Sequence, residues 1–221
     1  QQEVSYLELM TALLEAGADV NSRLTKSLWY TTYNRDLLGV DRTGATAFWR
    51  AAYALDVPAM RLLLAYGANP NLPTLRVPSR RRPASPDPSG LPPTPLGGPA
   101  VSPLLAASGV GYGQGFAGNS HRHVEYGWLP TVRFLVEELG ANVHDRDHDG
   151  YNAIHHAAAR GDNQLIMYLA DQGVDVSQVS RRGQTTADMA NGPVQRTQPF
   201  PDTVALLERL GAENSHRCLS C

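Results

Sequence analysis

The sequence has little of several features that define large classes of proteins. It contains two cysteines in 221 residues, which excludes a fold held together by a disulfide framework. No apolar run reaches the ~18 residues that a membrane-spanning helix needs. The net charge is −2, from 19 basic and 21 acidic side chains. This balance excludes a general electrostatic attraction to nucleic acid or to anionic membranes.

Recognisable catalytic sets are also missing. No Ser/His/Asp or Cys/His arrangement lies on a typical turn, and no pair of carboxylates is placed by a cleft-forming fold. We therefore predict that the chain is not an enzyme. Lys26 is the one lysine among the basic residues, and this skew, with abundant Ala, Gly and Pro, indicates a GC-rich, bacterial genome.

An internal repeat organises the chain. Each copy is the end of an apolar helix followed by glycine. The copies are LLEAGADVN (13–21), LLAYGANPN (63–71), VEELGANVH (136–144), LADQGVDVS (169–177) and LERLGAEN (207–214). A second marker precedes the last four copies, as DRTGATAFWRAA (41–52), VSPLLAASG (101–109), DHDGYNAIHHAAARG (147–161) and SRRGQTTADMANG (180–192). Both markers keep the same phase outside four insertions.

Together these residues resemble the ankyrin repeat. The resemblance implies an all-α ankyrin solenoid of about four and a half helix-turn-helix repeats with β-hairpin or finger loops. It places a single domain at 1–214 and a C-terminal tail at 215–221. The four insertions lie at about 22–40, 72–100, 111–127 and 193–199.

Glycine and proline mark the ends and the starts of the predicted helices. Glycines are expected to end them, and Pro58, Pro130 and Pro201 fall in predicted first turns, where a missing N–H is tolerated. The predicted helices are 7–15, 46–54, 58–65, 103–108, 130–138, 153–160, 163–171, 185–190 and 202–209. The first repeat shows only its second helix, so we expect this end to associate with another copy or to be covered by other residues.

Two adjacent histidines stand in the clearest repeat. His155 occupies the motif's histidine position, and the resemblance implies a hydrogen bond to backbone near the next turn. His156 points about 100° away on the helix, so the two cannot hold one metal ion together. The position of His156 resembles the partner-contacting position of ankyrin domains, and its equivalents are Arg50, Ala106 and Met189. These four positions are equally consistent with plain solvent exposure.

Two further segments contain potential metal ligands. DRDHDG at 145–150 resembles the start of a calcium loop, but its twelfth position is His156 instead of glutamate. Its residues Asp147 and Gly150 are also explained by the repeat's turn. His121 and His123 could share one side of an extended loop, yet only Glu125 is near enough to add a ligand. We therefore predict no metal site.

The insertions are the other candidate binding regions. Trp29, Tyr30 and Tyr33 lie in an otherwise polar segment, where aromatics are typical of interface hot spots; alternatively they fold back over the uncapped first repeat. The segment 72–100 holds nine of the sixteen prolines and is expected to be extended, without a regular hydrogen-bond ladder. Its Arg80–Arg82 stretch either docks to a groove or an acidic surface, or stays in a surface loop. The segment 111–127 is interpreted as a glycine-rich connector.

The last residues, HRCLSC, contain both cysteines. C-x-x-C followed by His attaches c-type haem, and the chain resembles bacterial proteins in which ankyrin repeats lead into a c-type cytochrome segment. By that resemblance Cys218 and Cys221 would hold haem c. The chain ends one residue before the required His, so we expect it to continue. A loose tail or a local disulfide is the alternative.

Two functions follow from these patterns. The first is a non-enzymatic scaffold that binds a protein partner through the concave helix face and the finger loops, using Trp29, Tyr30, Tyr33, Arg50, His156 and Met189, with no cofactor. The second is an exported electron-transfer protein with haem c at its C-terminus. The first implies a cytoplasmic protein, and the second a periplasmic or extracellular one.

Overall fold

The structure is a computed structural model of the chain. It describes residues 4–27, 37–78, 86–115, 118, 121–195 and 197–221. The helices in these ranges are α1 (Tyr6–Glu15), α2 (Ala47–Tyr53), α3 (Val57–Ala65), α4 (Pro103–Ala107), α5 (Trp128–Arg133), α6 (Ala153–Ala158), α7 (Asn163–Asp171), α8 (Thr186–Ala190) and α9 (Pro201–Arg209), and a π-helical turn, η3 (Phe134–Glu138), extends α5. The same ranges contain one isolated β-bridge and no named strand.

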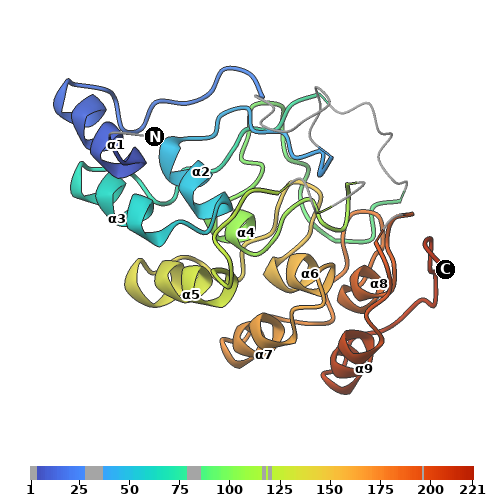
Figure 1. Cartoon of the computed structure of the whole chain (residues 1–221). Helices are drawn as coiled ribbons and strands as arrows, with labels where there is room; N and C mark the ends of the chain where they lie inside the picture. Colours follow the sequence, from blue (N-terminus) through green and yellow to red (C-terminus); the bar gives the residue numbers. More distant parts are fainter. Residues whose placement is uncertain (1–3, 28–36, 79–85, 116–117, 119–120, 196) are drawn as a thin grey trace.

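The helices form two rows (Figure 1). Helices α2, α4, α6 and α8 make the inner row, in which each helix contacts the next. Helices α1, α3, α5, α7 and α9 make the outer row, and from α2 onward each inner helix contacts the outer helix that follows it. The N- and C-terminal ends of the chain lie at opposite ends of the stack (Figure 1). This is the all-α repeat arrangement that the sequence predicts.

Short polar side chains fix the starts of the described α-helices other than α5 and α9. An oxygen of the residue before the helix accepts a hydrogen bond from a backbone N–H in the first turn, which has no partner within the helix. These capping residues are Ser5, Thr46, Asp56, Ser102, Asn152, Asp162 and Thr185. Every predicted helix begins and ends within two residues of its observed bounds. The predicted helix positions are therefore confirmed.

Glycine ends the outer helices, as predicted. Gly67 and Gly173 have φ values of 85° and 84°, in the left-handed region that glycine adopts at low cost. The next N–H, that of Ala68 or Val174, then donates back to the carbonyl of Leu63 or Leu169. This hydrogen bond satisfies a carbonyl that the ended helix leaves without a partner.

Small residues on the inner helices pack against large residues on the outer ones. Ala107, Ala157 and Ala190 are completely buried, which lets neighbouring helix pairs lie close together. The large apolar side chains that fill the space between pairs include Leu63, Phe134, Leu135, Ile166, Leu169 and Leu207, all buried. None of the helices in the described part of the chain is both long and apolar enough to cross a membrane.

Four connecting segments join one helix pair to the next: 16–46, 66–102, 139–152 and 172–185. Each is hydrogen-bonded to its neighbour through the backbone. The N–H groups of Leu75, His148 and Arg181 donate to the carbonyls of Thr43, Ala100 and Asp149, at 2.8, 3.0 and 2.9 Å. The connecting segments therefore stack side by side, as the helices do.

The proline-rich insertion differs from its prediction at both ends. The N–H of Thr74 donates to the carbonyl of Val101, and that of Ala100 donates to Thr74, so the two ends pair with each other. The expectation that this segment supports no regular hydrogen-bond ladder is wrong here, because the residues between the prolines keep their N–H groups. Arg80–Arg82 lies outside the described residues.

The glycine-rich connector lies against the inner side of the stack. A Cβ at Gly115 would lie 2.5 Å from Cα and from O of Leu38, and one at Gly113 would lie 2.1 Å from Cε of Met189. The contact of Gly115 is with backbone and leaves no room for a side chain, whereas that of Gly113 is with the end of the Met189 side chain. Glycine is therefore required for packing at position 115.

We predict that Gly115→Ala destabilises the protein by about 1–3 kcal/mol, because the new methyl group meets backbone atoms that cannot move cheaply. Gly39→Ala is the matched control. It has a positive φ of 68° but open space around it, so its cost is limited to about 1 kcal/mol of backbone strain. Urea unfolding of both variants measures the difference; equal stabilities would show that Gly115 is not tightly packed.

Candidate functional site: the inner side of the stack

The candidate partner-binding residues divide into three groups in the structure. Trp29, Tyr30 and Tyr33 lie outside the described residues. Arg50 is half-buried on α2, with its guanidinium 5.5 Å from the ring centroid of Tyr53. His156 on α6 and Met189 on α8 are 0% exposed, and so is Ala106 on α4.

These inner-helix positions therefore face the chain itself, and not solvent or a partner as the repeat pattern predicts. Two contacts contribute to this burial. Gly113 of the glycine-rich connector lies directly over Met189 and Ala159, and the turn before α6 places Asp147 beside His156.

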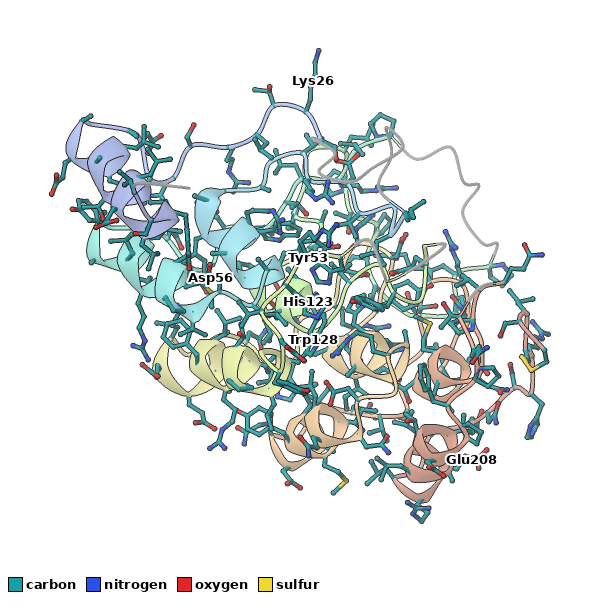
Figure 2. All side chains as sticks on the ribbon, in the orientation of Figure 1. Lys26, Tyr53, Asp56, His123, Trp128 and Glu208 are labelled. Atoms are coloured by element: carbon teal, nitrogen blue, oxygen red, sulfur yellow. A yellow bond between two sulfur atoms is a disulfide. The ribbon has the colours of Figure 1, made fainter. Side chains whose placement is uncertain are left out.

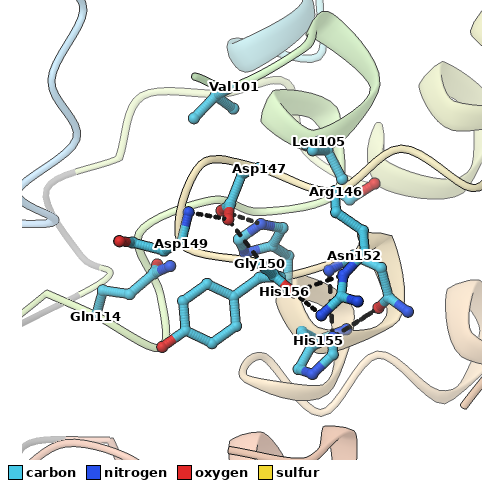
Figure 3. A network of polar contacts seen from close by, with 12 residues as sticks. Val101, Leu105, Gln114, Arg146, Asp147, Asp149, Gly150, Asn152, His155 and His156 are labelled. Atoms are coloured by element: carbon cyan, nitrogen blue, oxygen red, sulfur yellow. Dashed lines mark hydrogen bonds and ion pairs between the residues drawn. The ribbon is translucent and has the colours of Figure 1, made fainter. Parts of the chain in front are cut away.

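Asp147 and His156 form a buried pair (Figure 3). The Oδ2 atom of Asp147 lies 3.2 Å from Nε2 of His156, and their side chains are 2% and 0% exposed. The other carboxylate oxygen, Oδ1, accepts the N–H groups of Asp149 and Tyr151, both at 2.9 Å. This carboxylate holds the turn and the inner helix together.

The ionised form of Asp147 is favoured despite its burial. Burial by itself raises the pKa of this carboxyl group, but the contact with His156 and its charge, the charge of His148 and the Tyr151 N–H together lower it below the usual value. Among the described residues, neither ring nitrogen of His156 has a hydrogen bond, and the contact of Nε2 with Asp147 is an ion-pair contact. The pair thus leaves both buried ring nitrogens without a hydrogen bond.

His155 has the structural role that the resemblance implies. The N–H of Asn152 donates to Nδ1, and Nε2 lies 3.3 Å from the carbonyl of Gln184 in the next connecting segment. Burial lowers the pKa of His155 to about 3, with a smaller contribution from the charge of His156. The ring is therefore neutral at pH 7 and links α6 to the next repeat, which confirms the predicted backbone contact.

His123 lies between Tyr53 of α2 and Trp128 of α5 (Figure 2), and His121 belongs to the same aromatic cluster. The ring of His121 lies 4.2 Å from Tyr53, 4.7 Å from His123 and 5.6 Å from Trp128, measured between centroids. Its Nε2 is 2.7 Å from the carbonyl of Tyr53, and its Nδ1 is 3.2 Å from the hydroxyl of Tyr112.

Both nitrogens of His121 are therefore engaged with protein atoms. Burial lowers its pKa to about 3, outweighing the hydrogen bond to Tyr53. In the described part of the chain no three His, Cys, Asp or Glu side chains converge to hold a metal ion. The cluster fastens the third insertion to α2 and α5.

A cavity of about 320 Å³ opens beside the Asp147 turn. Leu38, Val40, Val101 and Val110 contribute to an apolar wall. The polar lining is made by Asp41, Gln114, Asp147, His148, Asp149 and Arg182. All four connecting segments and the glycine-rich connector contribute to this lining, so the stacking of the repeats creates the cavity.

The two cysteines lie in a tail that is attached to the last repeat. They are joined by a disulfide, and the N–H of Leu219 donates to the carbonyl of Gly192 at 2.9 Å. Ser215 also donates to Asp188 from its N–H and its hydroxyl, at 2.8 and 2.7 Å. Of the alternatives for this tail, the structure has the local disulfide.

Sequence reasoning missed the buried pair, the aromatic cluster and the cavity. The sequence does carry a signal for the pair, because Asp147 lies in the turn directly before the helix that contains His156. The aromatic cluster depends on how an insertion folds back, and the repeat pattern carries no information about that.

The two buried neutral histidines make stability depend on pH. His121 and His155 have folded pKa values of about 3, whereas an unfolded histidine titrates near 6.5. Their contribution is complete above pH ~6.5 and is lost as the pH falls, by about 1.4 kcal/mol per pH unit for each histidine. We predict a falling free energy of unfolding between about pH 6.5 and 5, above the range in which carboxylates titrate.

Urea unfolding at several pH values measures this slope. His121→Gln is expected to reduce the number of protons taken up on unfolding, and hence the slope, by about one. A variant of the exposed His216 is the control and is expected to keep the original slope. A free energy of unfolding that stays constant over this range would contradict the assignment of neutral buried rings.

Comparison with known proteins gives one finding. Residues 120–169 match the family model described as ankyrin repeats (many copies). No curated protein matches the chain. The matched range contains α5, η3, α6 and α7 together with Asp147 and His156. Over residues 120–169 the chain is therefore similar to ankyrin repeats.

Proposed function

We propose that this chain is a non-enzymatic scaffold that binds a protein partner on the inner side of its helix stack and on its connecting segments. The observation that carries this proposal is the stack of helix pairs, whose middle part, residues 120–169, matches the ankyrin repeat model. Ankyrin repeats generally mediate protein–protein interaction. In this proposal the chain has about four and a half repeats, and the connecting segments are its finger loops.

The proposed contact surface follows from what the inner face leaves accessible. His156 and Met189 are covered, so they act by holding the connector and the turn in place. Arg50 and the first insertion, with Trp29, Tyr30 and Tyr33, are the proposed contacts. Aromatic side chains in a polar segment supply a large contact area at low entropic cost.

The N-terminal end is proposed as a second contact surface. Helix α1 has no buried residue, and its apolar side chains Tyr6, Leu9 and Leu13 are 51%, 56% and 53% exposed. Tyr6, Leu9 and Leu13 are spaced so that they lie along one side of the helix. Self-association or packing of other residues on this end would bury them.

The haem alternative receives no support from the geometry of the tail. Thioether attachment of haem c needs two thiols, but the sulfurs of Cys218 and Cys221 are bonded to each other. We derive no electron-transfer step from this alternative. An absorption spectrum of the natively isolated protein tests the haem alternative, because bound haem produces a Soret band.

The scaffold proposal is tested by replacing Trp29, Tyr30 and Tyr33 with Ala. After a partner has been identified by crosslinking in the native host, we expect the triple variant to bind it at least tenfold more weakly, or about 1.4 kcal/mol, with an unchanged melting temperature. Tyr126→Ala, which removes an aromatic side chain that is 85% exposed, is the matched control. Undiminished binding by the triple variant would remove these three residues from the contact surface.

A further inference from the structure

We infer that the cavity beside the Asp147 turn takes the cationic side chain, Arg or Lys, of a partner protein. This inference rests on the proposed function and names the chemistry of the partner. Its basis is the charge, the size and the wall of the cavity.

The charged lining of the cavity is predominantly acidic. Asp41, Asp147 and Asp149 face one permanent cation, Arg182, with His148 beside them. Asp147 is already engaged by two N–H groups and by His156. Because these partners hold it, Asp147 cannot easily accept a further donor.

Asp149 is the carboxylate that can receive a ligand. Its Oδ2 lies 4.0 Å from Nε2 of His148, with side chains 40% and 29% exposed, and this distance is too long for a hydrogen bond. In Figure 3 its carboxylate points away from the buried pair. A guanidinium or ammonium group placed here would gain a charge-assisted hydrogen bond.

The wall of the cavity suits the rest of such a side chain. Leu38, Val40, Leu75, Val77 and Val101 are apolar, and the methylene stems of Arg and Lys pack well along apolar surface while their charged heads reach a polar site. A metal ion fits less well, because no three ligand side chains converge in the described residues. An anion would meet three carboxylates.

The size of the cavity suits one long side chain. Its volume of about 320 Å³ is at the lower end of the range for ligand pockets.

The test is an NMR titration of the ¹⁵N-labelled protein with acetyl-Leu-Arg-Val-amide. Acetyl-Leu-citrulline-Val-amide, which has nearly the same shape without the charge, is the reference probe. We expect the Arg peptide to shift the amide signals of His148, Asp149 and Gln114 and to bind at least tenfold more tightly than the citrulline peptide. Raising the salt concentration from about 50 to about 300 mM should weaken the binding of the Arg peptide.

Asp149→Asn should reduce binding of the Arg peptide to the level of the citrulline peptide. Its stability should stay within about 0.5 kcal/mol of the original, because the side chain is partly exposed. Asp202→Asn, at an exposed carboxylate on α9, is the matched control and should leave peptide binding unchanged.

Two results would overturn the inference. Equal binding of both peptides at the cavity would remove its preference for a cation while leaving the inner side of the stack as a binding surface. No shift of the cavity signals up to about 10 mM peptide, corresponding to binding weaker than about −2.7 kcal/mol, would remove the site. Partner capture through the first insertion is measured separately, so neither result is confused with failure of the scaffold proposal.

Discussion

Each inner helix of this protein packs against the inner helix of the next pair, and the other features of the structure depend on this packing. The small side chains of Ala107, Ala157 and Ala190 allow the close approach, and the outer helices supply the large apolar groups. Because helices α4 and α8 have five residues each, they are far too short to be stable alone. Their stability comes from neighbours, and the backbone hydrogen bonds between connecting segments extend the same dependence to the loops.

The packing of the connecting segments also changes which residues of the inner face are accessible. In a regular repeat stack the exposed inner positions are free to vary and to contact a partner. Here the glycine-rich connector lies on Met189 and the Asp147 turn lies beside His156, so both residues take part in the protein's own core. At the cavity beside this turn an apolar wall meets Asp41 and Asp149. In the proposed function, binding specificity therefore lies in the segments between the helices.

Most of the fold can be predicted from the sequence, but little of the candidate site can. Helix bounds follow from Gly67, Gly173 and the capping residues, since each acts locally within one turn. The link from His155 to the next repeat is equally predictable, because it depends on the repeat alone. The covering of Met189, the contacts of His121 and the pairing of the ends of the proline-rich insertion are contacts between segments far apart in the chain. Insertions carry no period, so their packing cannot be deduced from the motif.

The central claim is that the connector closes the inner face over Met189. The most direct measurement is an NMR experiment on protein labelled with ¹³C at the methionine methyl groups. The account predicts a nuclear Overhauser effect from the methyl group of Met189 to the α-protons of Gly113 and to the methyl group of Ala159, and little broadening of the Met189 signal by a soluble paramagnetic agent. Strong broadening together with absence of both contacts would show an open inner face and would contradict the account.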